Sequence, residues 1–317
     1  MSIGTVSKAL NTPARVAETT RKKVFDAVHE LDFVPKESAT SRARRGSGRV
    51  GVFAPFTAYP SFSERLSGVL TGLSKSNTEV VVFDVESAEQ SADVLESLPA
   101  LRSLDGLIIM SVPFGDRVAQ ALRRGRMPVM LVDTTQFDFP AVLTDDAGGG
   151  ALAARTLVES GRTRFSYVGQ KQLLDDFDSA SRRRQAGFEQ ELAAHKMALM
   201  PQHVLLVGND FEESRRSAQA LLSSDQRPDA VFAHTDELAA AVWAAARDLH
   251  LKVPEDLAII GFDDGPLARA LSLTTVHQPL RETGEWAARS ILTMVSDPTA
   301  IVPTLTLPVS LQRRDSA

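Results

Sequence analysis

LAIIGFDD (257–264) is a short apolar run that ends in two carboxylates, and similar runs precede it along the chain. These runs are apolar throughout rather than alternating, which is typical of strands buried on both faces of a parallel sheet. The others are VGVFAP (50–55), EVVVFDV (79–85), GLIIM (106–110), PVMLVD (128–133), RFSYVG (164–169), HVLLVG (203–208) and DAVFAH (229–234). The pattern therefore predicts mainly parallel sheet.

Amphipathic stretches separate the strand candidates, and each has the length of a helix. They cover 62–76, 88–102, 116–125, 148–160, 180–195, 212–224, 236–249 and 282–296. Alternation of strand and helix predicts an open, doubly wound α/β sheet, and this many units exceed one sheet of ordinary size. We therefore expect an α/β protein with two parallel-sheet lobes, whose ligand binds outside the carboxyl ends of the strands.

The first 49 residues differ from the rest in charge and pattern. They hold ten Lys and Arg against five Asp and Glu, whereas the whole chain has a net charge of -5. A basic head on an acidic body indicates that the head meets a polyanion; a solvated basic linker is the alternative. Short helices are predicted over 2–10 and 17–31, followed by a Ser/Arg/Gly-rich linker or hinge.

Several classes of protein are disfavoured by the sequence. The chain has no cysteine, its six histidines show no metal-ligand spacing, and the glycines at 148–150 are not followed by the Lys-Ser/Thr of a phosphate loop. No serine occupies a nucleophile elbow. The start lacks the layout of a secretory signal, and no apolar stretch is long enough to span a membrane. We expect a cytoplasmic protein that is not an enzyme and has no metal or cofactor.

Motifs along the whole chain resemble the lactose-repressor/galactose-repressor (LacI/GalR) family of transcriptional regulators. They are TVSKALN (5–11), TRKKV (20–24), ELDFVP (30–35), RVGVFAP (49–55), DGLII (105–109), RRQAGF (183–188), IIGFDD (259–264) and TTVHQPL (274–280). The resemblance implies an all-α, partial helix-turn-helix segment followed by two periplasmic-binding-protein-like lobes. It also implies a repressor that binds a near-palindromic operator in double-stranded DNA as a homodimer, with a sugar-like effector between the lobes.

Domain boundaries follow from the same resemblance, because the family's chain crosses between its lobes three times. We expect a DNA-binding segment at 1–35 and a hinge at 36–48. The N-terminal lobe is expected to cover 49–148 and about 279–303, and the C-terminal lobe 149–278 and about 304–317. Two alternatives share this fold: a ligand-binding protein that has lost DNA binding, and a solute-binding protein for uptake.

Two features depart from the family pattern. The first helix of the helix-turn-helix is missing from this sequence, and Met1 stands where relatives usually have valine. That helix packs on the recognition helix, so we expect the chain as given to bind DNA weakly. In the hinge, Arg42 replaces a leucine that wedges into the minor groove, and an arginine there would instead read a narrow groove's negative potential.

Recognition-helix positions give the candidate DNA contacts. Ile3, Gly4 and Lys8 would face the bases, with Ile3 against a thymine methyl and Lys8 donating to guanine. The hydroxyl and amide side chains suit phosphates, which fix register rather than sequence. These are Ser2, Thr5, Ser7 and Asn11. The alternative is a small capped helix with ordinary polar residues.

Effector candidates lie at the predicted strand ends, where sugar hydroxyls need carboxylates, an arginine fork and an aromatic plane. The resemblance places them at Ser61, Phe62, Asp145, Arg184, Phe211, Asp236 and Asp263. Each has an ordinary alternative: a helix cap for Asp236, a turn for Asp263, a solvated basic face for Arg184, and packing for the two phenylalanines. His277 and Gln278, at the expected crossover, remain unassigned.

Overall fold

The computed structural model describes residues 1–317 except 12–15, 31–47, 86–87, 102, 172–178 and 209. By their internal contacts, the residues form two compact units. The first comprises Met1–Phe62, Leu66–Ala141 and Gly284–Pro303, and the second Ser63–Arg65, Val142–Thr283 and Thr304–Ala317. The chain therefore passes repeatedly from one unit to the other, and each unit is described separately below.

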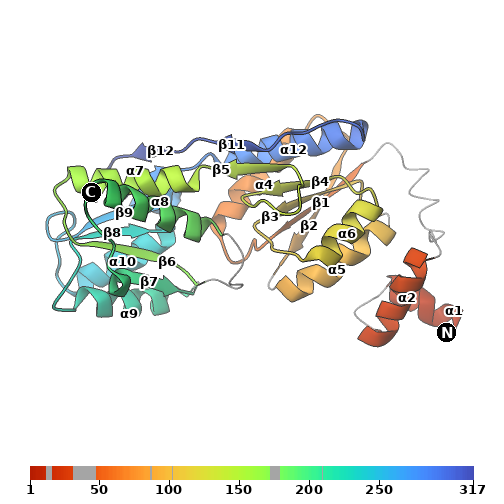
Figure 1. The fold of residues 1–317 in the computed structure, drawn as a ribbon, viewed down its shortest axis with the longest axis horizontal. Helices are drawn as coiled ribbons and strands as arrows, with labels where there is room; N and C mark the ends of the chain where they lie inside the picture. Colours follow the sequence, from red (N-terminus) through yellow and green to blue (C-terminus); the bar gives the residue numbers. More distant parts are fainter. Residues whose placement is uncertain (12–15, 31–47, 86–87, 102, 172–178, 209) are drawn as a thin grey trace. The chain divides into compact units, whose positions relative to one another are not determined.

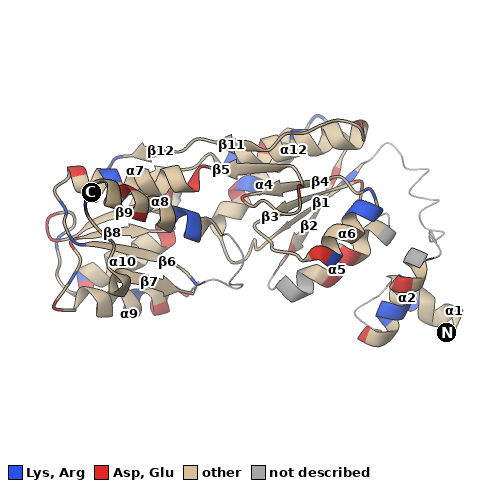
Figure 2. Cartoon of the chain, viewed as in Figure 1, with Lys and Arg blue, Asp and Glu red and all other residues tan. Residues whose placement is uncertain are grey.

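Helices α1 (Ile3–Asn11) and α2 (Glu18–Glu30) lie at the start of the chain, within about one residue of their predicted bounds. Ala9 of α1 packs with Val24 and Val28 of α2 in a small buried cluster. The basic residues Lys22 and Lys23 are exposed, and Figure 2 shows Lys and Arg positions in blue on α2. The two helices therefore bury their apolar sides together and leave charge outside.

The first sheet has the strand order β11-β5-β4-β3-β1-β2 (Figure 1). Its strands are β1 (Arg49–Ala54), β2 (Glu79–Asp84), β3 (Gly106–Met110), β4 (Val129–Val132), β5 (Ala141–Thr144) and β11 (Leu305–Leu307). The pairs β1–β2, β1–β3, β3–β4 and β5–β11 are parallel. Every residue of β3 is buried, as its continuous apolar run predicts.

The helices that accompany this sheet are α4 (Pro60–Leu73), α5 (Ala88–Leu101), α6 (Asp116–Arg124) and α12 (Leu280–Ser296). Helix α12 lies close to its neighbours where they have glycine. A Cβ added at Gly72 of α4 would meet Ala288, and one added at Gly106 of β3 would meet Ile291. The last long helix of the chain is thereby packed into the unit that contains residues 49–141.

The second sheet has the order β12-β10-β9-β8-β6-β7. Its strands are β6 (Phe165–Gln170), β7 (Val204–Val207), β8 (Ala230–Ala233), β9 (Ala258–Asp263), β10 (Thr274–His277) and β12 (Ser310–Gln312). Strand β12 pairs antiparallel with β10, whereas the pairs β10–β9, β9–β8, β8–β6 and β6–β7 are parallel. The carboxyl ends of β6, β8 and β9 therefore meet along one edge of the sheet.

Helices cover both faces of the second sheet (Figure 1). On β8, Ala230 and Phe232 belong to the cluster that includes residues of α7 (Asp146–Glu159) and α8 (Ala180–Ala194). Val231 and Ala233 belong to the cluster with α9 (Phe211–Leu222) and α10 (Asp236–Asp248). Two-sided burial explains why the strand is apolar at every position rather than at alternate ones.

Shorter elements complete the second unit: the 3₁₀ turn η2 (Pro201–His203) and the helix α11 (Pro266–Ala270). The predicted fold class, two parallel-sheet α/β lobes preceded by a helical segment, is confirmed. Strands β5, β10, β11 and β12 were not among the predicted runs: β11 and β12 span only three residues each, and β5 and β10 include polar side chains. Among the described helices, none is both long and apolar enough to cross a membrane.

Candidate functional site

The seam between α7 and α8 fixes the position of two charged side chains. A Cβ added at Gly150 would lie 2.0 Å from the carbonyl oxygen of Arg184, and one at Gly187 would lie 2.0 Å from that of Ala147. The glycines therefore let the two helix backbones approach closely. This contact brings Asp146, in the first turn of α7, beside the arginines at the start of α8.

Arg184 and Asp146 form a buried ion pair at the centre of the site. Nε of Arg184 donates to Oδ1 of Asp146 over 2.8 Å, and the two side chains are 4% and 0% exposed. Arg183 donates to the other oxygen, Oδ2, also over 2.8 Å. The Arg184 guanidinium carbon lies 3.5 Å from the ring centre of Phe262. The guanidinium plane is thus held by a carboxylate and an aromatic face.

The other end of the same guanidinium contacts His234, which follows β8. Nη1 donates to the His234 carbonyl oxygen over 2.6 Å and lies 3.2 Å from the ring nitrogen Nδ1. Burial, and then the positive charges of Arg184 and Arg183, lower the pKa of His234 well below its ordinary value. The imidazole is therefore neutral.

Asp263 ends β9 at the same edge of the sheet and has a φ of 116°, which is unusual for a residue other than glycine. Its Oδ1 accepts a hydrogen bond from Nε2 of Gln278 and lies 4.0 Å from Nη1 of Arg184. Burial raises the pKa of Asp263, and the Arg184 charge opposes that rise. The strained backbone and the buried carboxylate are both features of a functional position.

Asp236 opens α10, but it is not the N-cap; Thr235 caps the helix by accepting from the amide nitrogen of Leu238. Oδ1 of Asp236 accepts from the Thr275 hydroxyl over 2.6 Å, and Oδ2 accepts from the amide nitrogen of Gly265 over 2.7 Å. Burial, followed by the charge of Asp263, raises the pKa of Asp236. Each oxygen of this carboxylate already accepts one internal hydrogen bond.

Gln278, which the sequence left unassigned, is buried and joins several parts of the second unit. Its Oε1 accepts from Nη2 of Arg65 over 3.0 Å and from the Thr144 hydroxyl over 3.3 Å, while its Nε2 donates to Asp263. Residues 65, 144 and 278 lie near points where the chain passes between units. A polar chain thus connects the Asp263 carboxylate to the crossover segments.

The remaining predicted effector residues lie in other surroundings. Asp145 caps α7 by accepting from the amide nitrogen of Gly148 over 2.9 Å. Phe211 is the first residue of α9, where it is exposed, and no described contact joins it to Arg184. Ser61 and Phe62 belong to the other unit, and Phe62 is buried against Tyr59 in α4. The structure therefore brings together Arg184, Asp236 and Asp263 from the predicted set.

Sequence reasoning did not select Asp146, His234 or Phe262, and it left Gln278 unassigned. The sequence did contain a signal for Asp146, because this residue directly follows the predicted Asp145 at the start of a helix. His234 and Phe262 both lie inside predicted runs, one of them at a strand end. Both residues contact Arg184, and a strand pattern does not predict where this arginine lies.

Of the DNA-contact candidates, the structure describes part. The Ser2 hydroxyl accepts from the amide nitrogen of Thr5 over 3.2 Å and lies 2.9 Å from the Thr5 hydroxyl, so Ser2 caps α1. Gly4 and Lys8 are exposed on the same helix. The side chains of Ile3, Ser7 and Asn11, and the whole of Arg42, lie outside the described residues.

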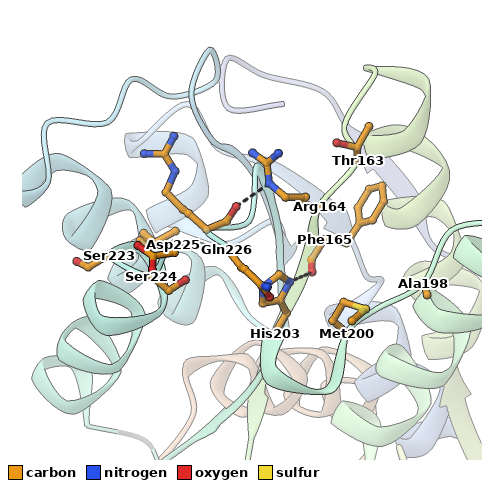
Figure 3. Close-up of a pocket in the computed structure, with 12 residues that line it drawn as sticks. Thr163, Arg164, Phe165, Ala198, Met200, His203, Ser223, Ser224, Asp225 and Gln226 are labelled. Carbon is orange, nitrogen blue, oxygen red and sulfur yellow. Dashed lines mark hydrogen bonds between the residues drawn. The ribbon is translucent and has the colours of Figure 1, made fainter.

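A separate pocket of about 760 Å³ lies at the opposite, amino-terminal edge of the second sheet (Figure 3). It is lined by residues that precede β6, by the segment around Met200 and His203, and by the end of α9. None of the predicted effector residues lines it. In the part of the chain that the structure describes, no cluster of His, Cys, Asp or Glu could hold a metal ion.

Comparison with known proteins supports both halves of the architecture. Residues 1–36 match the model of the bacterial regulatory proteins of the lacI family, and residues 154–317 match the periplasmic binding protein-like domain. The chain is 29% identical to the ribose operon repressor of Haemophilus influenzae, over 100% of this chain and 95% of the relative. It is 28% identical to the transcriptional repressor PurR of Aliivibrio salmonicida, over 94% and 90%. These relatives are repressors, not enzymes.

Solved structures agree with the sequence matches. A transcriptional regulator CelR–cellobiose complex superposes with a TM-score of 0.75 at 26% identity, covering 100% of this chain and 96% of the other. A LacI family regulator from Enterococcus faecium with bound ribose gives 0.74 at 26% identity, covering 85% and 98%. The matches cover the DNA-binding segment and both sheets. The chain therefore belongs to the lacI family of bacterial regulatory proteins.

Proposed function

We propose that this regulator is a repressor that binds a near-palindromic operator as a homodimer. A sugar-like effector binds at the carboxyl edge of the second sheet, and its binding either weakens or strengthens the affinity of the protein for the operator. The observation that carries the proposal is Arg184, held by Asp146, stacked on Phe262 and placed 4.0 Å from the Asp263 carboxylate. Relatives bind ribose and cellobiose, according to their structures, which supports a polyhydroxyl effector.

The hydrogen-bonding groups at this edge suit hydroxyls. Arg184 uses Nε and Nη1 within the protein, and Asp263 uses Oδ1, whereas no described residue bonds to Nη2 of Arg184 or Oδ2 of Asp263. A donor and an acceptor are thus left on two side chains whose atoms Nη1 and Oδ1 lie 4.0 Å apart. A hydroxyl both donates and accepts, so two adjacent hydroxyls fit this pair better than a group that only accepts.

The DNA-reading role is assigned to the basic N-terminal segment, 1–35, with the hinge at 36–48. Lys8 is exposed on α1 and would donate to guanine, and Ile3 would contact a thymine methyl. Ser2, Thr5, Ser7 and Asn11 would contact phosphates, and Arg42 would enter the minor groove. The lobes are taken as 49–148 with about 279–303, and 149–278 with about 304–317.

Exposed apolar side chains support the homodimer. Val82 lies on β2, an outer strand of the first sheet, and is 47% exposed; Leu206 lies on β7, an outer strand of the second, and is 40% exposed. Val94 on α5 and Phe211 on α9 are exposed as well. Outer strands with large apolar residues are normally covered by a partner, and a second copy of this chain is the partner that we propose.

Two rival functions are separated by one experiment. A ligand-binding protein without DNA binding would bind sugar but not the DNA upstream of its own gene, whereas a repressor would bind both. A gel shift with that DNA, at 50 and 200 mM salt, is the test, because phosphate contacts make binding salt-dependent. The match of residues 1–36 to a regulatory family argues against a solute-binding protein for uptake.

A further inference from the structure

His234 lies between β8 and Thr235, the N-cap of α10, at the carboxyl edge of the second sheet. The residue is 7% exposed, and its ring lies beside Arg184. The sequence assigns it no role, and the contacts described above give it only the position beside Arg184. The ring nevertheless shares the same guanidinium nitrogen, Nη1 of Arg184, with the Asp263 carboxylate.

The contact with Arg184 decides which ring nitrogen carries the proton. A guanidinium has donors only, so Nδ1 of His234, 3.2 Å from Nη1, can only accept. A neutral imidazole with an accepting Nδ1 has its hydrogen on Nε2. The His234 side chain is therefore a fixed, uncharged donor through Nε2–H.

This donor has no acceptor within the described part of the protein. The ring contacts Arg184 through Nδ1, the carbonyl oxygen accepts from the same arginine, and the amide nitrogen donates to the Val168 carbonyl oxygen, so no described residue bonds to Nε2. Nε2 of His234 is not one of the fully buried polar atoms without a partner, so it is open to solvent and a bound ligand can accept from it. The neighbouring Arg184 and Asp263 are the residues to which the effector is assigned, so an effector oxygen is a suitable acceptor.

We propose that His234 is a third effector-recognition residue, whose Nε2–H donates to an oxygen of a polyhydroxyl effector held by Arg184 and Asp263. This inference rests on the proposed function and deepens it. The three side chains supply two donors and one acceptor, Nη2, Nε2–H and Oδ2. They match an effector with adjacent oxygens, of which one hydroxyl donates to Asp263 and the other oxygen accepts from His234.

A pair of substitutions separates recognition from positioning. In His234→Asn, the amide oxygen takes the place of Nδ1 and still accepts from Arg184, but the distal donor is lost. In His234→Gln, the amide nitrogen takes the place of Nε2–H, while the acceptor for Arg184 is lost. If His234 only orients Arg184, the Asn variant retains effector binding and the Gln variant does not.

Calorimetry on the full chain measures the Kd for D-ribose, D-glucose and cellobiose. The sugar that binds most tightly is then titrated into the two variants. We expect His234→Asn to weaken its Kd by about five- to tenfold, as loss of one neutral hydrogen bond implies, and His234→Gln to stay within about threefold. An Asn variant that binds like the parent overturns the inference, as does a Gln variant weaker than the Asn variant. If the parent binds no sugar, the proposed function itself fails.

Discussion

Arg184 is the residue on which the candidate site depends, and its contacts define what its loss would do. The residue is almost completely buried, and its guanidinium bonds to Asp146 and His234 through Nε and Nη1 and stacks on the Phe262 ring. Removal of one member of a buried ion pair leaves the other charge without compensation. The residue therefore serves both the fold of the second unit and the proposed recognition of the effector.

We expect Arg184→Ala to abolish effector binding and to lower the free energy of unfolding by about 3–5 kcal/mol, because Asp146 stays buried next to Arg183 alone. Chemical denaturation and calorimetry measure the two effects. Arg182→Ala is the matched control: it lies two residues away on the exposed side of α8 and should change neither. Equal effects of the two substitutions would contradict this account of Arg184.

Asp236 makes a prediction about pH. Its folded-state pKa is raised above the unfolded value of about 4, so the folded protein holds the proton more tightly than the unfolded chain. Stability from this group is therefore present below about pH 4 and is lost as pH rises toward neutrality. Asp236→Asn should flatten that part of the curve, which thermal melts between pH 4 and 8 would show. If the melting temperature of the variant depended on pH as steeply as that of the parent, the raised pKa of Asp236 would be refuted.

At the residue scale, the sequence predicted the kinds of side chains better than their partners. Asp145 and Asp146 are adjacent carboxylates at a strand end, and nothing in their order tells which one caps α7 and which one pairs with Arg184. Asp236 and Asp263 were predicted together, but the hydrogen bonds that hold Asp236 come from Thr275 and Gly265, distant in sequence. Such long-range partners emerge only after folding.

At the scale of elements, the α7–α8 seam is the feature that positions the site. Gly187→Ala would place a Cβ about 2 Å from the Ala147 carbonyl, which is backbone and cannot move aside on its own. The helices would have to separate, at a cost of about 1–3 kcal/mol or more, and Arg184 would move away from Asp146. We expect a lower melting temperature together with weaker sugar binding.

Gly208→Ala is the control for that substitution. A Cβ at Gly208 would meet only the end of the Glu213 side chain, 3.7 Å away, so we expect the melting temperature and sugar affinity of the parent. If Gly187→Ala behaved in the same way, the close approach of the two helices would not be needed for the site.

Strand prediction succeeded for elements buried on both faces and failed at the sheet margins. β3 and β8 are apolar at every position, and both were found. β11 and β12 are three residues long and partly exposed, so no periodic pattern can develop in them. The order of strands in each sheet, with β1 and β9 internal, could not be predicted either, because it depends on packing between segments that are distant in the sequence.

For the whole molecule, the proposed homodimer is the property that can be tested most readily. We expect Leu206→Glu to shift the protein from dimer to monomer, because a charge on the outer strand β7 would be buried against a second copy. Sedimentation velocity measures the change. Ile301→Glu, at a residue that is 95% exposed, should leave the association state as it is. A Leu206→Glu protein that still sediments as a dimer would remove β7 from the proposed interface.

The proposed repression depends on the uneven charge along the chain. The first 49 residues carry the excess of Lys and Arg, and the match to the lacI family covers 1–36. A polyanion is thus expected to meet this segment, while the acidic remainder is repelled by it. Coupling to the effector requires that DNA and sugar favour different arrangements of the protein.

The most direct test of the central claim is fluorescence anisotropy of labelled DNA from upstream of the gene, titrated with the full chain in the absence and presence of the sugar that calorimetry selects. The account predicts saturable binding that competitor DNA of unrelated sequence does not abolish, and an affinity that the sugar changes by at least about fivefold in the parent but not in Arg184→Ala. Binding of the sugar with no effect on DNA affinity, or no specific DNA binding at all, would contradict it.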